Sequence, residues 1–324
     1  MAHAIRVHQY GGPEVLKFEQ VPLEAPGQGQ VQIRQHAVGL NYIDVYLRTG
    51  LYPQPSFPFT LGSEGAGEVI KVGPGVTEVA VGDRIAYAGP PGAYADERNI
   101  PAERIVKIPN SIDYKTAASM MLKGMTTQYL LKRTFKVGPG TTMLFHAAAG
   151  GVGLMACNWA KHLGATIIAT AGSADKCALA KEAGATHTIN YRTENWVDRV
   201  KDITGGKLCD VVYDSVGKDT FPASLDCIKP LGLFVTFGNA SGPIPPINAG
   251  MLSAKGSLFM TRPTLNTYTA SRADLVATAN DLIDVVSKGI VKIAVNQAYP
   301  LREARQAHTD LEARKTTGST VLLP

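Results

Sequence analysis

Cysteine is scarce in this sequence: there are four in 324 residues, and none lies within the first 124 positions. Cys157, Cys177, Cys209 and Cys227 are singly spaced, with neither a CxxC pair nor the spacing of a zinc knuckle. This scarcity excludes a disulfide scaffold and a four-cysteine zinc lobe. We therefore expect reduced, mostly structural thiols and no metal site.

Long hydrophobic runs are also missing. No segment approaches the roughly 18 uncharged apolar residues of a membrane-spanning helix, and the N-terminal MAHAIRVHQYGGP has no apolar core long enough for a secretory signal. We therefore expect a cytoplasmic protein that does not associate with membranes.

Charge of one sign is not concentrated anywhere. The chain has 32 Lys and Arg against 27 Asp and Glu, a net charge of +5, and its basic residues are dispersed. This distribution is compatible with an anionic ligand such as a phosphorylated cofactor. It argues against nucleic acid as a partner.

The length of 324 residues, 45% of them hydrophobic and 18% charged, is typical of an ordinary globular protein with two domains. Residues 1–124 contain short apolar segments separated by Gly and Pro clusters, which predicts a mostly β barrel or sandwich. The predicted strands of this domain are 4–7, 31–38, 67–72, 84–87 and 105–108. A helix predicted at 115–132 leads into the second domain.

Residues 125–262 alternate between strand and helix patterns, which predicts a parallel sheet with helical crossovers. The predicted strands are 142–146, 166–171, a short one near Thr188, 209–213, 232–237 and 257–261, and the predicted helices are 152–163, 174–182, 194–203 and 219–227. After Arg262 this alternation ends, and a helix at 272–287 precedes β-like segments at 297–301 and 319–323. We expect residues 263–324 to return to the first domain.

The segment 141–161 carries the clearest motif. A predicted buried strand at 143–145 runs into a small-residue turn and then a helix, and the turn contains Ala149, Gly150, Gly151, Val152 and Gly153. A helix that begins at such a turn presents unpaired backbone N–H groups, which can bind a pyrophosphate.

The motif is weak when taken alone, because Ala148 occupies the position of the first glycine of a strict GxGxxG. A turn that binds nothing is the alternative. The repeated strand and helix pattern that follows favours a dinucleotide site, in which Gly150 lets the backbone approach the phosphates and Gly153 lets the helix pack closely on the strand.

The second strand of this domain has no acidic residue at its tip. An acid there would bind the ribose 2′-OH of NAD. The sequence instead offers Ser173, Lys176, Tyr191 and Arg192, which can hold a 2′-phosphate by charge-assisted hydrogen bonds. Asp175 is the one contrary sign, and the pattern as a whole favours NADPH.

Eight segments carry a family resemblance: GGPEVL, GLNYIDVYLRTGLYP, LGSEGAGEV, VGDRIAY, AAAGGVG, VVYDSVG, FGNASG and TRPTL. Together they resemble the zinc-free, zeta-crystallin-like quinone oxidoreductases of the medium-chain dehydrogenase/reductase superfamily, over essentially the whole chain. The resemblance implies an α/β fold with a Rossmann domain inserted in a mostly β GroES-like catalytic domain. It also implies NADPH as donor, a quinone as acceptor, and a homodimer joined through the last Rossmann strand at 257–261.

Zinc-dependent relatives have a histidine in a GHE motif where this chain has Ser63. Without a Lewis acid, alcohol oxidation is not expected, whereas hydride delivery to an electrophilic quinone or enone needs only position and a dry pocket.

The resemblance also implies the site residues. Asn41, Tyr46 and Arg262 are implied as catalytic, with Asp44 nearby, although Asn41 also suits a turn and Tyr46 a core position. The residues implied to bind the cofactor are Asn41, Thr127, Ala149, Gly150, Gly151, Val152, Gly153, Ser173, Lys176, Tyr191, Ser215, Phe237, Gly238, Asn239, Ser241, Thr261 and Arg314. Ala240 replaces a serine that is common in relatives.

No residue stands out as a general acid. We expect the quinone oxygen to be protonated from solvent or through Tyr46, and His146 to be a packed histidine.

Two other functions stay open at this stage. The acceptor can be an α,β-unsaturated aldehyde or ketone, since the same hydride chemistry serves both. Some relatives are lens structural proteins or bind AU-rich RNA, but dispersed charge and the lack of a stacking motif for RNA make this the weakest interpretation.

Overall fold

The computed structural model describes all 324 residues, which divide into two compact units. Unit 1 comprises Met1–Met125, Thr269–Ser287 and Ile293–Pro324, and unit 2 comprises Thr126–Tyr268 and Lys288–Lys292. Unit 1 is therefore discontinuous in sequence. The domain limits expected from the sequence, 1–124, 125–262 and 263–324, stay a prediction.

Unit 1 is built around a seven-stranded sheet with the order β15-β16-β3-β5-β6-β8, in which β7 also pairs with β3. Its strands are β3 (Gln30–Leu40), β5 (Glu64–Val72), β6 (Arg84–Ala88), β7 (Glu97–Pro101), β8 (Val106–Lys107), β15 (Val295–Pro300) and β16 (Ser319–Leu323). The C-terminal strand β16 is antiparallel to β3, with Val321 opposite Gly39. A separate three-stranded sheet contains β2 (Leu16–Val21), β1 (Ala2–Val7) and β4 (Phe59–Thr60).

The helices of unit 1 are α1 (Tyr42–Thr49), the first part of α2 (Tyr114–Tyr129), α8 (Arg272–Ser287) and α9 (Ala304–Glu312). Helix α1 begins with a capping box formed by Asn41 and Asp44 and ends at Gly50, whose φ is 84°. The sequence interpretation identified neither α1 nor α9. The residues of α1 are rich in aromatic and β-branched types with modest helix propensity, so its caps and tertiary contacts decide its conformation.

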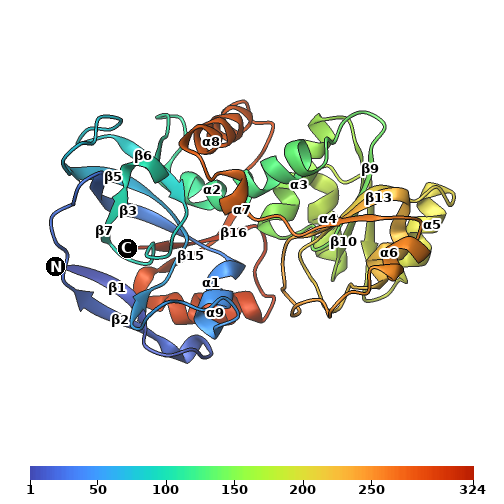
Figure 1. Ribbon diagram of the computed structural model, residues 1–324, viewed down its shortest axis with the longest axis horizontal. Coiled ribbons are helices and arrows are strands. Elements are labelled where there is room, and N and C mark those ends of the chain that lie inside the picture. Colours follow the sequence, from blue (N-terminus) through green and yellow to red (C-terminus); the bar gives the residue numbers. More distant parts are fainter. The chain divides into compact units, whose positions relative to one another are not determined.

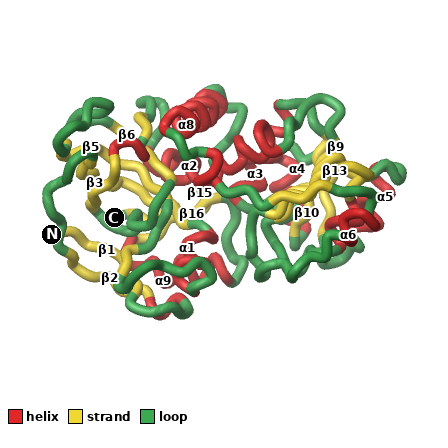
Figure 2. Tube along the Cα trace, in the orientation of Figure 1, coloured by secondary structure: helices red, strands yellow, loops and turns green.

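Unit 2 contains a six-stranded sheet with the order β11-β10-β9-β12-β13-β14, and every pair in it is parallel. Its strands are β9 (Thr142–Phe145), β10 (Thr166–Ala171), β11 (His187–Asn190), β12 (Cys209–Asp214), β13 (Ile228–Thr236) and β14 (Phe259–Thr261). Helices α3 (Gly151–His162) and α4 (Ala174–Glu182) cover one face, and α5 (Trp196–Thr204) and α6 (Gly250–Ala254) cover the other (Figures 1 and 2). The predicted parallel sheet with helical crossovers is confirmed.

Some elements differ from the sequence prediction. The helix predicted at 219–227 is wrong: only a short 3-10 helix, Ala223–Cys227, is present. Pro222 explains this, because proline lacks an N–H and disfavours helical backbone at the residue before it. The predicted strand 257–261 starts two residues later, because Ser257 has a φ of 55°. The helix predicted at 115–132 ends at Tyr129 and continues as a π-helical segment, Leu130–Thr134.

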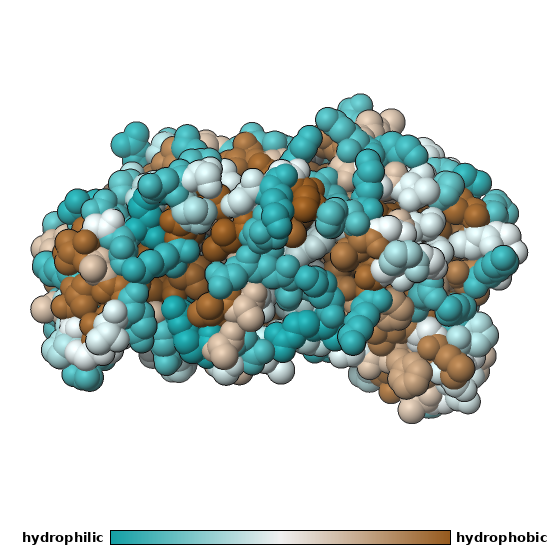
Figure 3. Space-filling model, turned by 90° about the horizontal axis from the view of Figure 1, so that it is seen from above, coloured by the Kyte–Doolittle hydropathy of each residue, from teal (hydrophilic) through white to brown (hydrophobic).

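Each unit has its own hydrophobic core. The core of unit 1 includes Val31 and Ile33 of β3, and the core of unit 2 includes Leu144, Val212 and Phe234 from neighbouring strands. On the face drawn in Figure 3, hydrophobic residues form separate patches between hydrophilic ones. No helix combines the length and apolar composition needed to cross a bilayer.

Candidate functional site

The glycine-rich turn of unit 2 connects β9 to α3. Gly150 is the N-cap residue of α3, and a Cβ atom built on it would meet only the Ala147 carbonyl oxygen, at 3.3 Å. A Cβ on Gly153 would lie 2.5 Å from the Cα atom of Ala148, so only glycine lets α3 pack this closely on the turn. Ala149 lies in the turn, and Gly151 and Val152 are the first two residues of α3. The open space in front of Gly150 and the unpaired N–H groups of a helix start fit an anionic group such as a pyrophosphate.

The tips of β10 and β11 bring Ser173, Lys176 and Tyr191 together. The strands are paired up to Ala171 and Asn190, and a Cβ on Gly172 would lie 2.5 Å from the hydroxyl oxygen of Tyr191. Ser173 caps α4, and its hydroxyl oxygen accepts from the backbone N–H of Lys176 at 3.3 Å. The Ser173 hydroxyl and the Tyr191 phenol therefore lie at one strand edge, next to the backbone of Lys176.

The loops that follow β12 and β13 are bonded to each other. The backbone N–H of Ala240 donates to the Ser215 carbonyl at 3.1 Å, and that of Ser241 donates to the Val216 carbonyl at 2.8 Å. A Cβ on Gly238 would lie 2.5 Å from the Ser215 carbonyl oxygen, which explains the glycine there. The ring of Phe237 lies 5.7 Å from that of Phe145. The predicted Ser215, Phe237, Gly238, Asn239 and Ser241 are thus brought together.

Arg262 directly follows Thr261, the last residue of β14. Its guanidinium donates to the Thr236 hydroxyl at 3.1 Å and to the Gly238 carbonyl at 3.0 Å. With the Asn239 amide oriented to satisfy both of its ends, the amide oxygen accepts from Arg262 at 3.1 Å. These contacts of Arg262 hold the loop after β13 in place.

Asn41, predicted as catalytic, lies in unit 1 at the start of α1. Its side-chain amide donates to the Glu64 carboxylate at 2.8 Å, and that carboxylate also accepts from the backbone N–H of Leu122 at 2.8 Å. The Lys123 ammonium lies 3.4 Å from the same carboxylate. All four groups lie in unit 1, so Asn41 is held in one orientation by a buried ion pair.

The remaining predicted residues are divided between the units. In unit 1, Tyr46 is buried, with its ring 5.3 Å from that of Tyr52, and Arg314 follows α9 with a φ of 59°. Burial raises the pKa of Tyr42, at the start of α1, and the positive charge of Arg314 opposes this rise. In unit 2, Thr127 is fully buried near the end of α2.

Asp44 is the residue whose importance the sequence interpretation underestimated. It is fully buried, and it accepts from the Asn41 backbone N–H at 2.9 Å, the Ser63 hydroxyl at 2.9 Å and the Tyr94 hydroxyl at 3.2 Å. Burial raises its pKa from 3.8 to about 7, against the lowering effect of these three donors and of Lys123. The Asn41-x-x-Asp44 spacing of a capping box was the available signal.

His146 is packed inside unit 2, as the sequence predicts. Its ring nitrogens lie 2.9 Å from the Thr170 hydroxyl and 3.2 Å from the Ser224 hydroxyl. Ser224 also donates to the Asp214 carboxylate at 3.1 Å. Ser224, His146 and Asp214 are each fully or almost fully buried, so this group organises the end of β12 and offers no accessible nucleophile.

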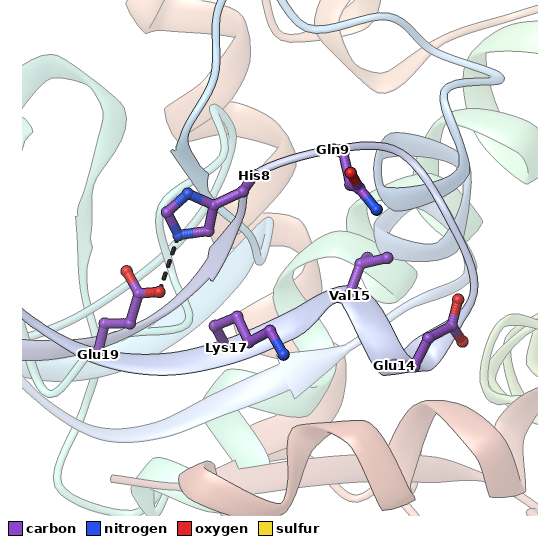
Figure 4. Close-up of a pocket in the computed structure, with 6 residues that line it drawn as sticks. All are labelled: His8, Gln9, Glu14, Val15, Lys17 and Glu19. Carbon is purple, nitrogen blue, oxygen red and sulfur yellow. Dashed lines mark hydrogen bonds and ion pairs between the residues drawn. The ribbon is translucent and has the colours of Figure 1, made fainter.

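An open hollow lies elsewhere in unit 1, along the hairpin of β1 and β2. It is lined by His8, Gln9, Glu14, Val15, Lys17 and Glu19 (Figure 4). The His8 ring lies 2.8 Å from the Glu19 carboxylate, and none of the predicted site residues lines this hollow. No three His, Cys, Asp or Glu side chains of the protein are grouped so that they could hold a metal ion.

Comparison with known proteins identifies relatives over the full chain. A quinone oxidoreductase of Pseudomonas aeruginosa is 54% identical over 325 residues, covering 100% of both chains. Quinone oxidoreductase 1 of Escherichia coli is 48% identical, again over 100% of both chains. A 2-haloacrylate reductase of a Burkholderia species is 46% identical over 100% of this chain and 99% of its own.

Solved structures agree with this similarity. The Escherichia coli quinone oxidoreductase complexed with NADPH superimposes with a TM-score of 0.98 over 99% of this chain and 100% of its own, at 48% identity. The family models that match are the alcohol dehydrogenase GroES-like domain, at residues 27–110, and the zinc-binding dehydrogenase, at residues 151–284. They confirm the predicted fold class, a Rossmann domain inserted in a mostly β GroES-like domain.

The buried carboxyl group of Asp44 predicts a specific pH dependence of stability. Since its pKa is about 7 in the folded protein and 3.8 in an unfolded chain, the folded state holds a proton between pH 4 and pH 7 that the unfolded state releases. The free energy of unfolding of the wild type, relative to an Asp44→Asn variant, should therefore fall by up to about 4 kcal/mol from pH 4 to pH 7.5.

Urea unfolding of both proteins across this pH range measures the difference. Asp198→Asn, at an exposed position of α5, serves as the control and should change stability by less than about 0.5 kcal/mol at any pH. A wild-type to Asp44→Asn difference that stays constant with pH would contradict the prediction.

Proposed function

The chain belongs to the quinone oxidoreductase family, and we propose that it transfers reducing equivalents from NADPH to quinones without a metal. The observation that carries this proposal is the agreement between the similarity to known relatives and the groups at the strand ends of unit 2. The relatives named quinone oxidoreductase match the full chain at 48–54% identity. The strand ends of unit 2 carry a glycine-rich helix start, which we assign to the pyrophosphate, and Ser173, Lys176 and Tyr191, which we assign to the 2′-phosphate.

NADPH fits the groups that the chain presents. The start of α3 and the open space at Gly150 suit the pyrophosphate, and the absence of an acid at the tip of β10 removes repulsion of the 2′-phosphate. The loops held together at Ser215 and Ala240 suit the nicotinamide ribose, and Arg262 keeps the second loop in place. Two structural neighbours, from Escherichia coli and from a mycobacterium, were solved in complex with NADPH.

Bound NADPH supplies a hydride, so reduction of a quinone to a hydroquinone requires in addition one proton. We assign Asn41 and Tyr46 to the nicotinamide and substrate end of the site. Asn41 is held by Glu64, which fixes the direction of its amide dipole. The proton comes from solvent or from the Tyr46 hydroxyl. Thr127, Thr261 and Arg314 are assigned to the cofactor.

Zinc is not needed for this reaction. Where zinc-dependent relatives have a histidine, the Ser63 hydroxyl donates to the Asp44 carboxylate at 2.9 Å, and the first 124 residues contain no cysteine. A quinone is already electrophilic, so positioning and a dry pocket are sufficient.

Reduction of an activated alkene is the second candidate. The observation that favours it is the 2-haloacrylate reductase that is 46% identical to this chain over its full length. A hydride delivered to the β-carbon of an enone or a haloacrylate uses the same donor and the same binding groups, so the shape of the acceptor pocket decides between the two.

We further propose that the protein is cytoplasmic and acts without nucleic acid or membrane partners. All four cysteines are unpaired, and Cys157, Cys209 and Cys227 are buried, with burial raising the pKa of each thiol. Unpaired thiols are typical of a reducing compartment.

Steady-state kinetics on the purified protein test the function. Oxidation of NADPH should be fast with a panel of quinones and at least tenfold slower in kcat/KM with alkenals and 2-haloacrylates. Treatment with a metal chelator should leave the rate unchanged. The quinone assignment fails if an activated alkene is the better acceptor, and the proposal as a whole fails if no acceptor supports NADPH oxidation.

Cofactor selectivity is tested at Lys176. Replacing Lys176 with Ala removes a cation near the 2′-phosphate, so the KM for NADPH should rise at least about tenfold while the KM for NADH changes less than twofold. Lys201→Ala, which removes the same charge from α5, is the matched control and should change neither value. Equal increases for both cofactors would remove Lys176 from the 2′-phosphate site.

A homodimer is proposed to form through β14. This strand pairs only with β13, so its outer edge is unpaired within the sheet, and Phe259 on it is 63% exposed. An exposed apolar edge strand is suited to pairing with a second copy of the same strand.

Light scattering after gel filtration checks this prediction. The wild type should have twice the mass of the 34.4 kDa chain, and Phe259→Lys should shift the population toward the monomer. Phe18→Lys, at another exposed aromatic residue on β2, is the control and should leave the mass unchanged. A monomeric wild type, or a Phe259→Lys variant that remains fully dimeric at low protein concentration, contradicts the proposal.

A further inference from the structure

A chain of hydrogen bonds inside unit 1 links α9 to the start of α1. Arg48 of α1 is fully buried, and its guanidinium forms a bidentate pair with the Glu312 carboxylate at 2.8 and 2.9 Å. The same guanidinium lies 3.0 Å from Nδ1 of His308. Nε2 of His308 lies 3.1 Å from the Tyr94 hydroxyl, which in turn lies 3.2 Å from the Asp44 carboxylate.

The chemistry of these groups fixes the direction of every bond. Arginine has only donors, so Nδ1 of His308 must accept from Arg48. The proton of the neutral ring is then on Nε2, which donates to the oxygen of Tyr94, and the hydroxyl proton of Tyr94 is directed at Asp44. Burial, together with the charge of Arg48, lowers the pKa of His308 to about 3, so the ring stays neutral at physiological pH.

The chain ends at the carboxylate that caps α1. Asp44 accepts from Tyr94, from the Ser63 hydroxyl and from the Asn41 backbone N–H, so its oxygens are used as acceptors throughout. Three donors favour the ionised carboxylate, whereas burial favours the neutral acid. Removing one donor therefore changes the balance at the residue that orients Asn41.

We propose that Tyr94 and His308 are positioning residues of the reaction, which hold Asp44 as an acceptor and thereby fix Asn41 and Ser63. This inference rests on the proposed function, because that function assigns Asn41 to the reactive end of the cofactor.

A purely structural role explains the chain less well. Buried polar groups cost desolvation free energy, and apolar residues of similar volume often give equal or greater stability. A fully satisfied polar network instead specifies one geometry. Here Arg48 cannot accept a hydrogen bond, so the network has no alternative arrangement with reversed donors.

The ionisable and charged groups around Asp44 come from several elements. They are Arg48 on α1, Glu64 on β5, Tyr94 after β6, Lys123 on α2, and His308 and Glu312 on α9. Of these, Lys123 lowers the pKa of Asp44, as do the hydrogen bonds from Tyr94, Ser63 and Asn41. We therefore assign the pH dependence of kcat that is expected below to the protonation of Asp44.

Tyr94→Phe tests the proposal, because it removes only the hydroxyl from a fully buried ring. The fall of kcat toward acidic pH should be centred near pH 7 in the wild type and should move up by about one pH unit in the variant, since a lost charge-assisted bond is worth about that much. The kcat at pH 7 should fall about fivefold and recover above pH 9, with the KM for NADPH changed less than twofold.

Tyr87→Phe is the matched control. Tyr87 is also fully buried in unit 1, but its hydroxyl donates to the Gln35 side chain and makes no bond to Asp44. This variant should lose stability and keep the wild-type pH profile. A pH profile of Tyr94→Phe that equals that of the wild type overturns the inference while the quinone reductase activity of the wild type stands.

Two variants at His308 provide a second test that does not depend on Tyr94→Phe folding. In His308→Gln the carboxamide oxygen can accept from Arg48 and the amide can donate to Tyr94, so the wild-type profile should be kept. In His308→Leu both bonds are lost, so the Tyr94 hydroxyl is no longer held toward Asp44, and the profile should shift in the same direction as in Tyr94→Phe. Equal profiles for the two variants overturn the inference.

The hydrogen-bond directions can be measured without any activity. In ¹⁵N-histidine-labelled wild-type protein, the His308 ring should be neutral with its proton on Nε2 from pH 5 to pH 8. A proton on Nδ1, or protonation of this ring near pH 6, overturns the inference. A wild type that shows the expected ring but oxidises no NADPH instead contradicts the proposed function.

Discussion

Parallel strands that end at the same edge of one sheet are the constraint on which the cofactor half of this protein depends. In unit 2 the turn after β9, the tips of β10 and β11, and the loops after β12 and β13 all follow the carboxyl ends of neighbouring strands. Residues that are up to about a hundred positions apart in sequence therefore meet at one edge. Gly153 and Gly238 are needed where backbone approaches backbone, and Gly150 leaves open space at the start of α3.

Unit 1 meets a different requirement. The polar groups buried at the start of α1 have to be satisfied by partners within this unit. Here Glu64 is paired with Lys123 and with the Asn41 amide, while Asp44 accepts from three donors. Such a network is costly to desolvate but leaves no freedom of orientation once it is complete. The network therefore fixes the orientation of Asn41, although burying its polar groups costs desolvation free energy.

Much of the cofactor half could be predicted from the sequence, because its signals are local. The turn around Gly150, the missing acid at the tip of β10 and the strand and helix alternation each lie within a few tens of residues. The polar network of unit 1 could not be predicted in this way, because its members are far apart in the sequence. Tyr94 is 50 positions from Asp44 and 214 positions from His308, and His308 is 260 positions from Arg48. Helix α1 could not be predicted for a different reason: its aromatic and β-branched residues favour other conformations until tertiary contacts form.

The pairing of β16 with β3 has a consequence for the order in which the chain folds during synthesis. Residues Thr126–Tyr268 of unit 2 are continuous in sequence and hold all six strands of their sheet. In unit 1, strand β3 lacks its neighbour β16 until Ser319–Leu323 has left the ribosome. Unit 2 can therefore complete its core first, while the edge of β3 that pairs with β16 stays open until β16 is synthesised and needs protection on a ribosome-bound chain.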